Sequence, residues 1–296
     1  MDVSLFRKHV SGKSKIFALL ELFRPELPFA AGCCVLLAQV LALDGFPAPV
    51  TGLLGFCSAF LLSASALIFN DYFDFNIDLV NAPQRPIPSK RVSPGEAIGL
   101  GIGATMVGLT LSAALGITVL LFAIPVWFIG FLYNWRYKRS GLPGNLLVSI
   151  SVASLFVYGG FTVGDPLNPL LLFFGMATGL LDLAEEIAGD VLDVEGDRRE
   201  GVKSLAVTQG VLFAQHVATL LWIFLIIFSW LPLISGRISS EYLPPLIILN
   251  LSLVIGTLGF SLASGEKRRP YLRVNYIGPL LAVIVLLLQR YLGTGS

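Results

Sequence analysis

Long apolar stretches alternate with short polar connections along almost the whole chain. The stretches occupy residues 24–43, 50–69, 95–115, 117–135, 145–162, 168–189, 205–233, 241–263 and 273–292. Each is close to, or longer than, the roughly 20 residues with which a helix crosses a bilayer. The pattern predicts an all-α membrane protein with nine transmembrane helices that surround a central cavity, in a single membrane domain over residues 1–296.

The composition agrees with this pattern. Hydrophobic residues make up 55% of the chain, charged residues 13%, and the mean hydropathy is +0.80, whereas soluble domains carry about 25% charged residues. A polar, charged segment from Met1 to Glu21 precedes the first apolar stretch, and no small-residue cleavage site stands out. We therefore expect a retained amino-terminal segment, residues 1–20, and a first stretch that is not a removable signal peptide.

The basic residues are distributed unevenly between the connections. Of the 20 Lys and Arg residues, all except Arg237 and Arg290 lie in the amino-terminal segment or in the even-numbered connections. The positive-inside rule then predicts that the amino terminus and the even connections are cytoplasmic and the carboxyl terminus lies outside. The net charge of +1 gives no indication of a nucleic-acid partner, and the oligomeric state stays open.

Two acidic motifs with the same spacing follow the second and sixth apolar stretches. NDYFDFNID contains Asp71, Asp74 and Asp78, and GDVLDVEGD contains Asp190, Asp193 and Asp197. Positions i, i+3 and i+7 of a helix fall within an arc of about 60°, so each motif predicts one acidic stripe. Both stripes belong to helix ends on the same side of the membrane, where they can face each other across a cavity.

Any metal at these stripes must be bound by oxygen atoms. Cys33, Cys34 and Cys57 lie inside apolar stretches, and the two histidines, His9 and His216, form no cluster that could bind zinc. Carboxylates without Cys or His suit Mg²⁺, which binds a few carboxylates together with phosphate oxygens and water. We therefore predict Mg²⁺ and a diphosphate between the stripes, although a solvated acidic rim is the alternative.

Further polar residues lie beside the stripes. Asn70 is a candidate neutral ligand or, alternatively, a cap of the loop that follows it. Asp182, Glu185 and Glu186 extend the second stripe into its span, where an ionised carboxylate costs about 2.5–3.5 kcal/mol on insertion scales. Bound cations would offset this cost, but the role of these three acids stays open.

Basic side chains near the stripes are candidates for binding the diphosphate. Arg85 lies in the proline-rich loop NAPQRPIPS, and a guanidinium there can bind two phosphate oxygens at once. Lys138 is a second candidate contact, Lys203 a weaker one, and Tyr133 a shield for a cationic intermediate. The alternatives are positive-inside residues without a ligand and, for YNWRYKRSG, anchors at the membrane interface.

The two motifs and the nine predicted spans together resemble the UbiA superfamily of intramembrane prenyltransferases. NDYFDFNID matches the first aspartate-rich motif of that family and DVLDVEGD the second. The segments NAPQRPIPS and DVEGDRREG are most similar to the archaeal digeranylgeranylglyceryl phosphate synthase branch, and the chlorophyll synthase branch carries a similar RPIPS segment. The resemblance covers nearly the whole chain after residue 20.

The resemblance implies an enzyme that binds an isoprenyl diphosphate through Mg²⁺, ionises the allylic C–O bond and lets an acceptor capture the cation. The implied metal ligands are Asn70, Asp71, Asp74, Asp78, Asp190, Asp193 and Asp197, and the implied catalytic residues are Asp74, Asp193, Arg85, Lys138 and Tyr133. The lipophilic acceptor expected for the archaeal branch is geranylgeranylglyceryl phosphate, with Lys90 or Arg91 near its phosphate. An aromatic, quinone-precursor or chlorophyllide acceptor is the alternative.

Two positions depart from the family pattern. Lys90 lies where these branches commonly have Gly, and the Tyr-x-x-x-Lys element appears as Tyr133 and Lys138, one residue longer. The acceptor side and the role of Lys138 therefore stay open. Other functional classes remain as rivals: a cation-coupled transporter with acids near the midplane, a CDP-alcohol phosphotransferase, whose Asp-Gly-x-x-Ala-Arg element is missing here, and a binding or scaffold protein.

Overall fold

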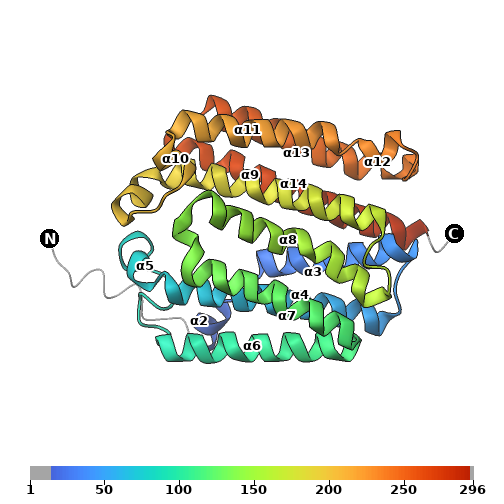
Figure 1. Ribbon diagram of the computed structural model, residues 1–296, viewed down its shortest axis with the longest axis horizontal. Coiled ribbons are helices and arrows are strands. Elements are labelled where there is room, and N and C mark those ends of the chain that lie inside the picture. Colours follow the sequence, from blue (N-terminus) through green and yellow to red (C-terminus); the bar gives the residue numbers. More distant parts are fainter. Residues whose placement is uncertain (1–14, 294–296) are drawn as a thin grey trace.

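The computed structural model describes residues 15–293, and every regular element within them is a helix (Figure 1). The long helices are α3 (Glu26–Leu43), α4 (Pro49–Phe73), α6 (Pro94–Leu115), α7 (Ile117–Leu132), α8 (Leu142–Val163), α9 (Pro169–Glu200), α11 (Val211–Phe228), α13 (Leu243–Leu262) and α14 (Arg269–Gly293). The first 14 residues of the predicted amino-terminal segment lie outside the described residues.

Shorter elements join these helices. They are α2 (Lys15–Glu21), α5 (Phe75–Asn81), the π-helix η1 (Tyr133–Tyr137), η2 (Lys138–Ser140), α10 (Leu205–Thr208), α12 (Leu231–Ile234), η3 (Ser240–Tyr242) and η4 (Gly265–Arg268). Most of them lie at the two ends of the bundle, where the chain turns between long helices (Figure 1).

The number of membrane spans agrees closely with the sequence pattern. Within residues 15–293, eight helices are long and apolar enough to cross a membrane. The remaining long helix is α9, which has 32 residues but carries Asp182, Glu185 and Glu186 in the part that would cross the bilayer. The prediction of nine spans is therefore close to the structure but not exactly confirmed, since eight helices have the length and composition of a span and α9 is long but acidic.

The long helices form a closed bundle. Helices that follow one another in the chain pack side by side, as α3 does with α4, α4 with α6, α8 with α9 and α13 with α14. The last helix, α14, returns to pack against α3, and α3 also packs against α8. This closure leaves the interior side chains of α3, α4, α8, α9 and α14 facing a common space.

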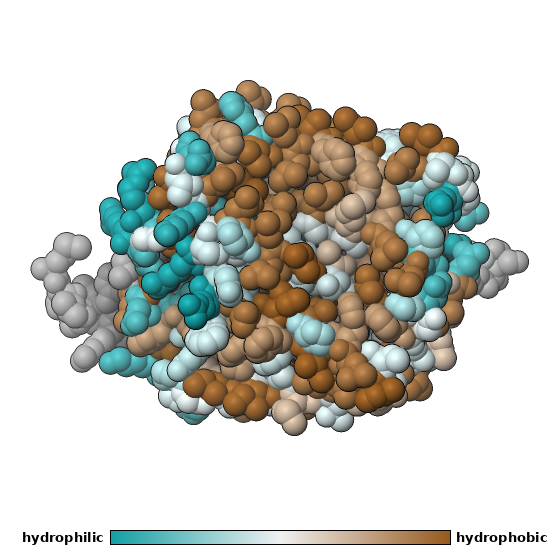
Figure 2. All heavy atoms as spheres, viewed as in Figure 1, coloured by the Kyte–Doolittle hydropathy of each residue, from teal (hydrophilic) through white to brown (hydrophobic). Residues whose placement is uncertain are grey.

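The outer surface of the bundle is apolar. Figure 2 shows hydrophobic side chains over the flank of the molecule and hydrophilic side chains gathered at its two ends, most densely at the end where α5 and α10 lie. Large side chains such as Leu262, Ile234 and Leu212 are 85%, 78% and 64% exposed. Exposed apolar surface on this scale belongs in lipid, so the chain is a multi-pass membrane protein.

Small residues bring α8 and α9 close together. A Cβ atom built on Gly175 would lie 2.8 Å from the backbone oxygen of Ala153, and one built on Gly179 would lie 2.9 Å from the Cβ atom of Ala153. Glycines four residues apart allow such close approach of helices in membranes. The contact matters for the interior because α8 then holds the acidic face of α9 through Asn145 and Ser149.

Candidate active site

A cavity of about 1420 Å³ lies between the helices. One end is lined by charged side chains from the carboxyl-terminal parts of α4 and α9, and the deeper part by apolar side chains such as Leu67, Val152, Phe156, Phe174 and Leu286. The predicted central cavity is thus present, and both acidic motifs reach the same end of it.

The first acidic motif spans a break between two helices. α4 ends at Phe73, Asp74 occupies the junction, and α5 begins at Phe75, so the predicted stripe is not on one continuous helix. Hydrogen bonds from Asp74 N to Asn70 O (2.9 Å) and from Asp78 N to Asp74 O (2.8 Å) nevertheless keep helical spacing through the junction. Asp71, Asp74 and Asp78 are all at least nine-tenths buried.

Each aspartate of this motif has a basic partner. Arg24 pairs with Asp71, and Lys138 pairs with Asp74. Arg85 donates from Nη1 to both carboxylate oxygens of Asp78, at 2.8 and 2.6 Å, and lies 3.5 Å from Asp71. Burying three carboxylates is tolerable because cations are held against them.

The three aspartates do not all face the main cavity. Asp74 and Asp78 line it, whereas Asp71 lines a smaller pocket of about 320 Å³ beside Glu21 and Pro86. Arg24 and Arg85 line both spaces and so form the wall between them. Asn70 lines the main cavity, and its side-chain amide lies among Asn134, Asp74 and Lys138.

The proline-rich loop holds Arg85 in place. Ile87 and Val92 are each 1% exposed and pack with Ala18, Leu22 and Ile68 of the neighbouring helices. Within the loop, the backbone N of Arg85 donates to Ala82 O at 2.9 Å and Ser89 Oγ donates to Arg85 O at 2.6 Å. Turn hydrogen bonds and apolar burial therefore hold the loop in place, together with its prolines.

The second acidic motif lies on one continuous helix, α9, and all three of its aspartates line the cavity. Asn145 donates to Asp190 at 3.0 Å, and Arg269 donates to Asp193 at 3.2 Å. Asp197 is partly buried and lies beside Ser204. Three carboxylates that line one end of the cavity make that end suited to bind a cation.

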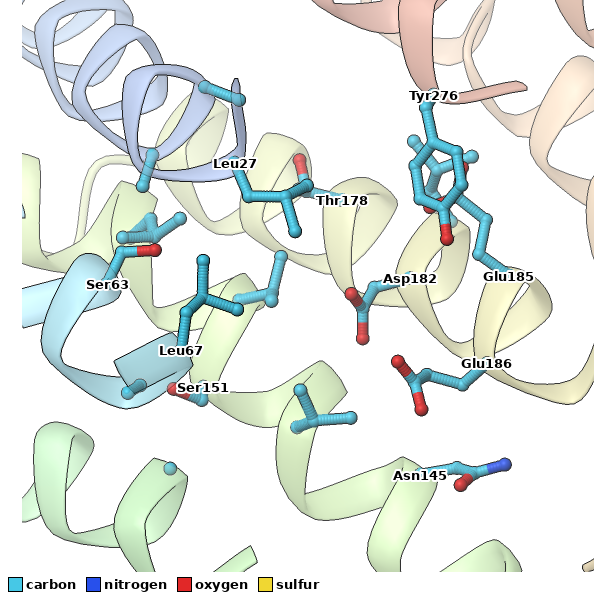
Figure 3. A pocket seen from close by; sticks show the side chains of 18 of the residues that line it. Leu27, Ser63, Leu67, Asn145, Ser151, Thr178, Asp182, Glu185, Glu186 and Tyr276 are labelled. Carbon is cyan, nitrogen blue, oxygen red and sulfur yellow. The ribbon is translucent and has the colours of Figure 1, made fainter. Parts of the chain in front are cut away.

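Three further acids of α9 lie deeper in the cavity. Ser149 donates to Asp182 Oδ2 at 2.9 Å, and the hydroxyl of Tyr133 donates to Glu186 Oε2 at 3.2 Å. In Figure 3 the carboxylates of Asp182 and Glu186 point toward each other into the open space, and the Tyr276 hydroxyl points to the same region. Glu185 is 6% exposed, and its Oε1 has no hydrogen-bond partner among the described residues.

A π-helical turn accounts for the extra residue between Tyr133 and Lys138. Residues Tyr133–Tyr137 form the π-helix η1, and the backbone N of Lys138 donates to Tyr133 O. A π-turn closes over five residues instead of four, so Lys138 lies one full turn after Tyr133 and on the same face. Both side chains consequently line the cavity, with Tyr133 bonded to Glu186 and Lys138 to Asp74.

Three predicted basic residues are not brought to the cavity. Lys90 is exposed with φ +60°, and Arg91 donates to Glu21 at 2.6 and 3.1 Å, which raises the pKa of its guanidinium. Lys203 is exposed in the loop after α9, where its backbone N donates to Arg139 O at 3.1 Å. None of the three side chains lines the cavity, so the structure does not support their predicted contact with substrate.

The left-handed backbone at Lys90 explains the first departure from the family pattern. A residue with φ near +60° is most easily Gly, because a Cβ atom there crowds the following carbonyl. Lys90 adopts this conformation, with φ +60°. The position is therefore strained for Lys and suited to Gly.

Sequence reasoning missed several residues of the site. Arg24 was counted only among the 18 basic residues of the predicted cytoplasmic side, yet it pairs with Asp71, 47 positions away in sequence, and lines the cavity. Asn134, Asn145 and Ser149 also contact the acidic residues or Asn70. The sequence provides only a weak indication that these residues belong to the site, namely that each is a polar residue within or beside an apolar stretch.

The donor set of this site fits Mg²⁺. Within the described residues no group of three or more His, Cys, Asp or Glu side chains lies close enough together to hold a metal ion by itself. Mg²⁺ rarely uses such a group, because it binds through one or two carboxylates and completes its shell with water and phosphate oxygens. Carboxylates of both motifs at one end of the cavity provide that kind of partial shell.

Comparison with known proteins decides the family. The UbiA prenyltransferase family matches residues 31–286 of this chain. The chain belongs to the UbiA prenyltransferase family. Its similarity to curated members of this family extends over nearly the full length of both proteins. It is 34% identical to a digeranylgeranylglyceryl phosphate synthase of Methanopyrus kandleri, over 91% of this chain and 98% of the relative. It is 30% identical to a protein of the same name from Pyrococcus horikoshii, over 92% of this chain and 96% of the relative.

Solved structures of this UbiA fold agree with the helical bundle. One that concerns digeranylgeranylglyceryl phosphate synthase in membranes superposes with a TM-score of 0.71 at 27% identity, covering 92% of this chain and 98% of that chain. A UbiA homologue from Aeropyrum pernix superposes with a TM-score of 0.78 at 16% identity, over 89% and 98%. A UbiA homologue from Archaeoglobus fulgidus, bound to GPP and Mg²⁺, superposes with a TM-score of 0.66 at 20% identity. The match covers 90% of this chain and 98% of that chain.

Proposed function

We propose that this UbiA-family protein transfers a geranylgeranyl group from its diphosphate to the free hydroxyl of geranylgeranylglyceryl phosphate, in a reaction that requires Mg²⁺. The observation that carries the proposal is the meeting of both acidic motifs and three basic side chains at one end of an otherwise apolar cavity. A lipid with an anionic diphosphate at one end of a long apolar chain matches this arrangement.

The charged end would bind the diphosphate. Asn70, Asp71, Asp74, Asp78, Asp190, Asp193 and Asp197 are the candidate ligands, with Asp71 acting from behind the wall that Arg24 and Arg85 form. Mg²⁺ supplies neutralisation of the charge that develops on the leaving diphosphate. Arg85 and Lys138 lie against Asp78 and Asp74 at this end of the cavity, where their side chains can also donate to phosphate oxygens.

The step carried by the protein is charge stabilisation at both sides of the breaking bond. Arg24, Arg85 and Lys138 stabilise the diphosphate as the allylic C–O bond breaks, because preorganised donors act strongly in a site with little water. Tyr133, which lines the cavity next to Glu186, presents its aromatic face to the allylic cation. The surrounding helices exclude bulk water, so that the acceptor captures the cation.

The apolar part of the cavity is deep enough for the prenyl chain. From Asp190 to Phe174 along α9 there are 16 residues, and a rise of 1.5 Å per residue gives about 24 Å. Carbon–carbon bonds of about 1.5 Å limit an extended geranylgeranyl chain to roughly 20 Å. The volume of about 1420 Å³ also exceeds the 300–1,000 Å³ typical of sites for one small ligand, which leaves room for donor and acceptor chains.

The acceptor phosphate needs a different partner from the one that the sequence indicated. Lys90 and Arg91 do not line the cavity, whereas Arg136 and Arg139 line its charged end. We assign the acceptor phosphate to these two arginines. The charged end would face the cytoplasm, because it also carries most of the basic connections, and the whole chain would act as one membrane domain.

The archaeal acceptor is favoured over an aromatic or quinone-precursor acceptor by the relatives. The curated proteins that match at 34% and 30% identity over nearly their whole length are digeranylgeranylglyceryl phosphate synthases. A chain that retains both acidic motifs and the cavity at that similarity is expected to share their acceptor.

Product analysis tests this proposal. Purified protein in lipid nanodiscs is given geranylgeranyl diphosphate, Mg²⁺ and, in separate reactions, geranylgeranylglyceryl phosphate or 4-hydroxybenzoate. We expect the mass of the digeranylgeranyl ether with the first acceptor and no prenylated product with the second. Transfer only to the aromatic acceptor would reject the assigned acceptor. Cysteines introduced beside Arg85 in intact cells can be labelled with a thiol reagent that does not cross the membrane. Labelling from outside the cell would reject the assigned orientation.

A further inference from the structure

Asp182, Glu185 and Glu186 form an acidic group that the diphosphate site does not use. It lies on α9 one to two turns deeper than Asp190 and lines the apolar part of the cavity. The cations of the site are engaged elsewhere, since Arg24, Arg85 and Lys138 are paired with the first acidic motif. None of the three deep acids has an ion-pair partner among residues 15–293, although acids inside a membrane span carry an insertion cost.

The hydrogen bonds of these acids leave ligand-binding atoms in the cavity. Glu186 is held through one oxygen, Oε2, by Tyr133, and Asp182 through one oxygen, Oδ2, by Ser149. The second oxygen of each carboxylate is available to the space that both acids face in Figure 3. Glu185, more than nine-tenths buried, also has an oxygen without a partner among the described residues. Buried acceptors of this kind call for a donor from a ligand.

The depth of Glu186 places it beside the reacting carbon. Glu186 precedes Asp190 by four residues, which is about 6 Å along the helix axis. A diphosphate bound at the level of Asp190 and Asp74 therefore has its first prenyl carbons at the level of Glu186. Asp182 lies about a further 6 Å deeper along α9, beside the following part of the prenyl chain.

We propose that Glu186 is the general base of the reaction and that Asp182 and Glu185 bind the acceptor hydroxyl beside it, an assignment that rests on the proposed prenyl transfer. The C–O bond of the donor breaks, and its electron pair leaves with the diphosphate. A lone pair of the acceptor hydroxyl forms the new C–O ether bond. The hydroxyl proton passes to the free carboxylate oxygen of Glu186, which later returns it to solvent.

This site selects the class of acceptor. The oxygen atoms of Asp182 and Glu186 that face the cavity accept hydrogen bonds from a neutral hydroxyl, and the negative charge that Glu186 carries as a base disfavours an anionic group beside the reacting carbon. The acceptor is therefore a lipid alcohol that brings its hydroxyl to the deep acids and keeps its phosphate at the charged end. A carbon nucleophile without an acidic proton would not use this group of acids.

The test compares an alcohol with a more acidic nucleophile. The Glu186→Gln variant is assayed in nanodiscs with geranylgeranyl diphosphate, Mg²⁺ and either geranylgeranylglyceryl phosphate or its analogue with a thiol in place of the hydroxyl. General-base catalysis contributes about 10²–10⁴-fold, so we expect transfer to the hydroxyl to fall at least 100-fold. A thiol needs less help to lose its proton, and its loss is expected to be at least tenfold smaller.

Donor binding separates this role from a role in the diphosphate site. The variant is expected to retain radiolabelled geranylgeranyl diphosphate with a Kd within threefold of the wild type. Glu241→Gln, which removes an exposed acid near the opposite end of the bundle, is the control and keeps full activity. If Glu186→Gln does not fold, Glu186→Asp replaces it, and is expected to lose more activity with the alcohol than with the thiol.

Three outcomes would overturn the inference. A loss under tenfold with the alcohol, equal losses with both nucleophiles, or loss of donor binding would each show that Glu186 is not the base. Wild-type protein that transfers the prenyl group to no alcohol would overturn the proposed function itself. The two failures are distinguishable, because the first leaves wild-type transfer intact.

Discussion

The π-helical turn between Tyr133 and Lys138 predicts how this chain tolerates a change in length. In an α-helix, residues five apart are about 140° from each other around the axis, whereas residues four apart are about 40° apart. The π-turn brings Lys138 back onto the face of Tyr133 despite its fifth residue. Deleting Trp135, which is 57% exposed, should turn η1 into an α-turn and leave Lys138 on the same face.

The opposite change should misplace Lys138. Inserting one Ala after Trp135 rotates Lys138 by about a further 100° and removes its ammonium from Asp74 and from the diphosphate. One preorganised donor to a developing anion is worth about 10²–10³-fold in rate. We expect the insertion to lose activity to the level of Lys138→Met, about 100-fold or more, and the deletion to stay within tenfold of wild type.

The assay is the initial rate of geranylgeranyl transfer in nanodiscs at saturating Mg²⁺, with the melting temperature of each variant as the control for folding. A folded deletion variant that is as slow as Lys138→Met would refute the reasoning. An insertion variant with wild-type rate would do the same, because Lys138 would then act without its place on the Tyr133 face.

Other features give further expectations. Removing Mg²⁺ with a chelator should stop transfer, and adding Mg²⁺ back should restore it. Asp74→Ala or Asp193→Ala should lower the rate at least 100-fold at any Mg²⁺ concentration. Transfer that persists in either variant would contradict the metal site. Gly175→Val should lower the free energy of unfolding by about 2 kcal/mol or more, because its Cβ atom would lie 2.8 Å from a backbone oxygen. Gly103→Val is the control, because a Cβ atom there has no atom within 4 Å. Thermal melting in detergent compares the two variants. Lys90→Gly should raise stability by up to about 1 kcal/mol by relieving a positive φ and change the transfer rate less than threefold; a large loss of rate would place Lys90 back in the site.

Predictions that depend only on neighbouring residues in the sequence agree best with the structure. The apolar stretches set the helices because each is long enough to span a bilayer and contains few charges. The repeated spacing of Asp190, Asp193 and Asp197 determined one face of α9, since helical geometry depends only on residue separation. The end of the helix at the proline-rich loop was likewise predictable, because proline restricts its own backbone and that of its neighbour, whereas the path of the loop as consecutive turns was not.

The partners of the acidic residues depended on tertiary structure. Arg24 meets Asp71 across 47 positions, Tyr133 meets Glu186 across 53, and Lys138 meets Asp74 only because a π-turn rotates it. Such contacts depend on helix packing and on the exact turn at a helix end, neither of which is encoded in a local pattern. The sequence by itself determined which charges enter the membrane. Only the packing of the helices decided which of them share a site, because side chains from distant segments meet where the bundle closes.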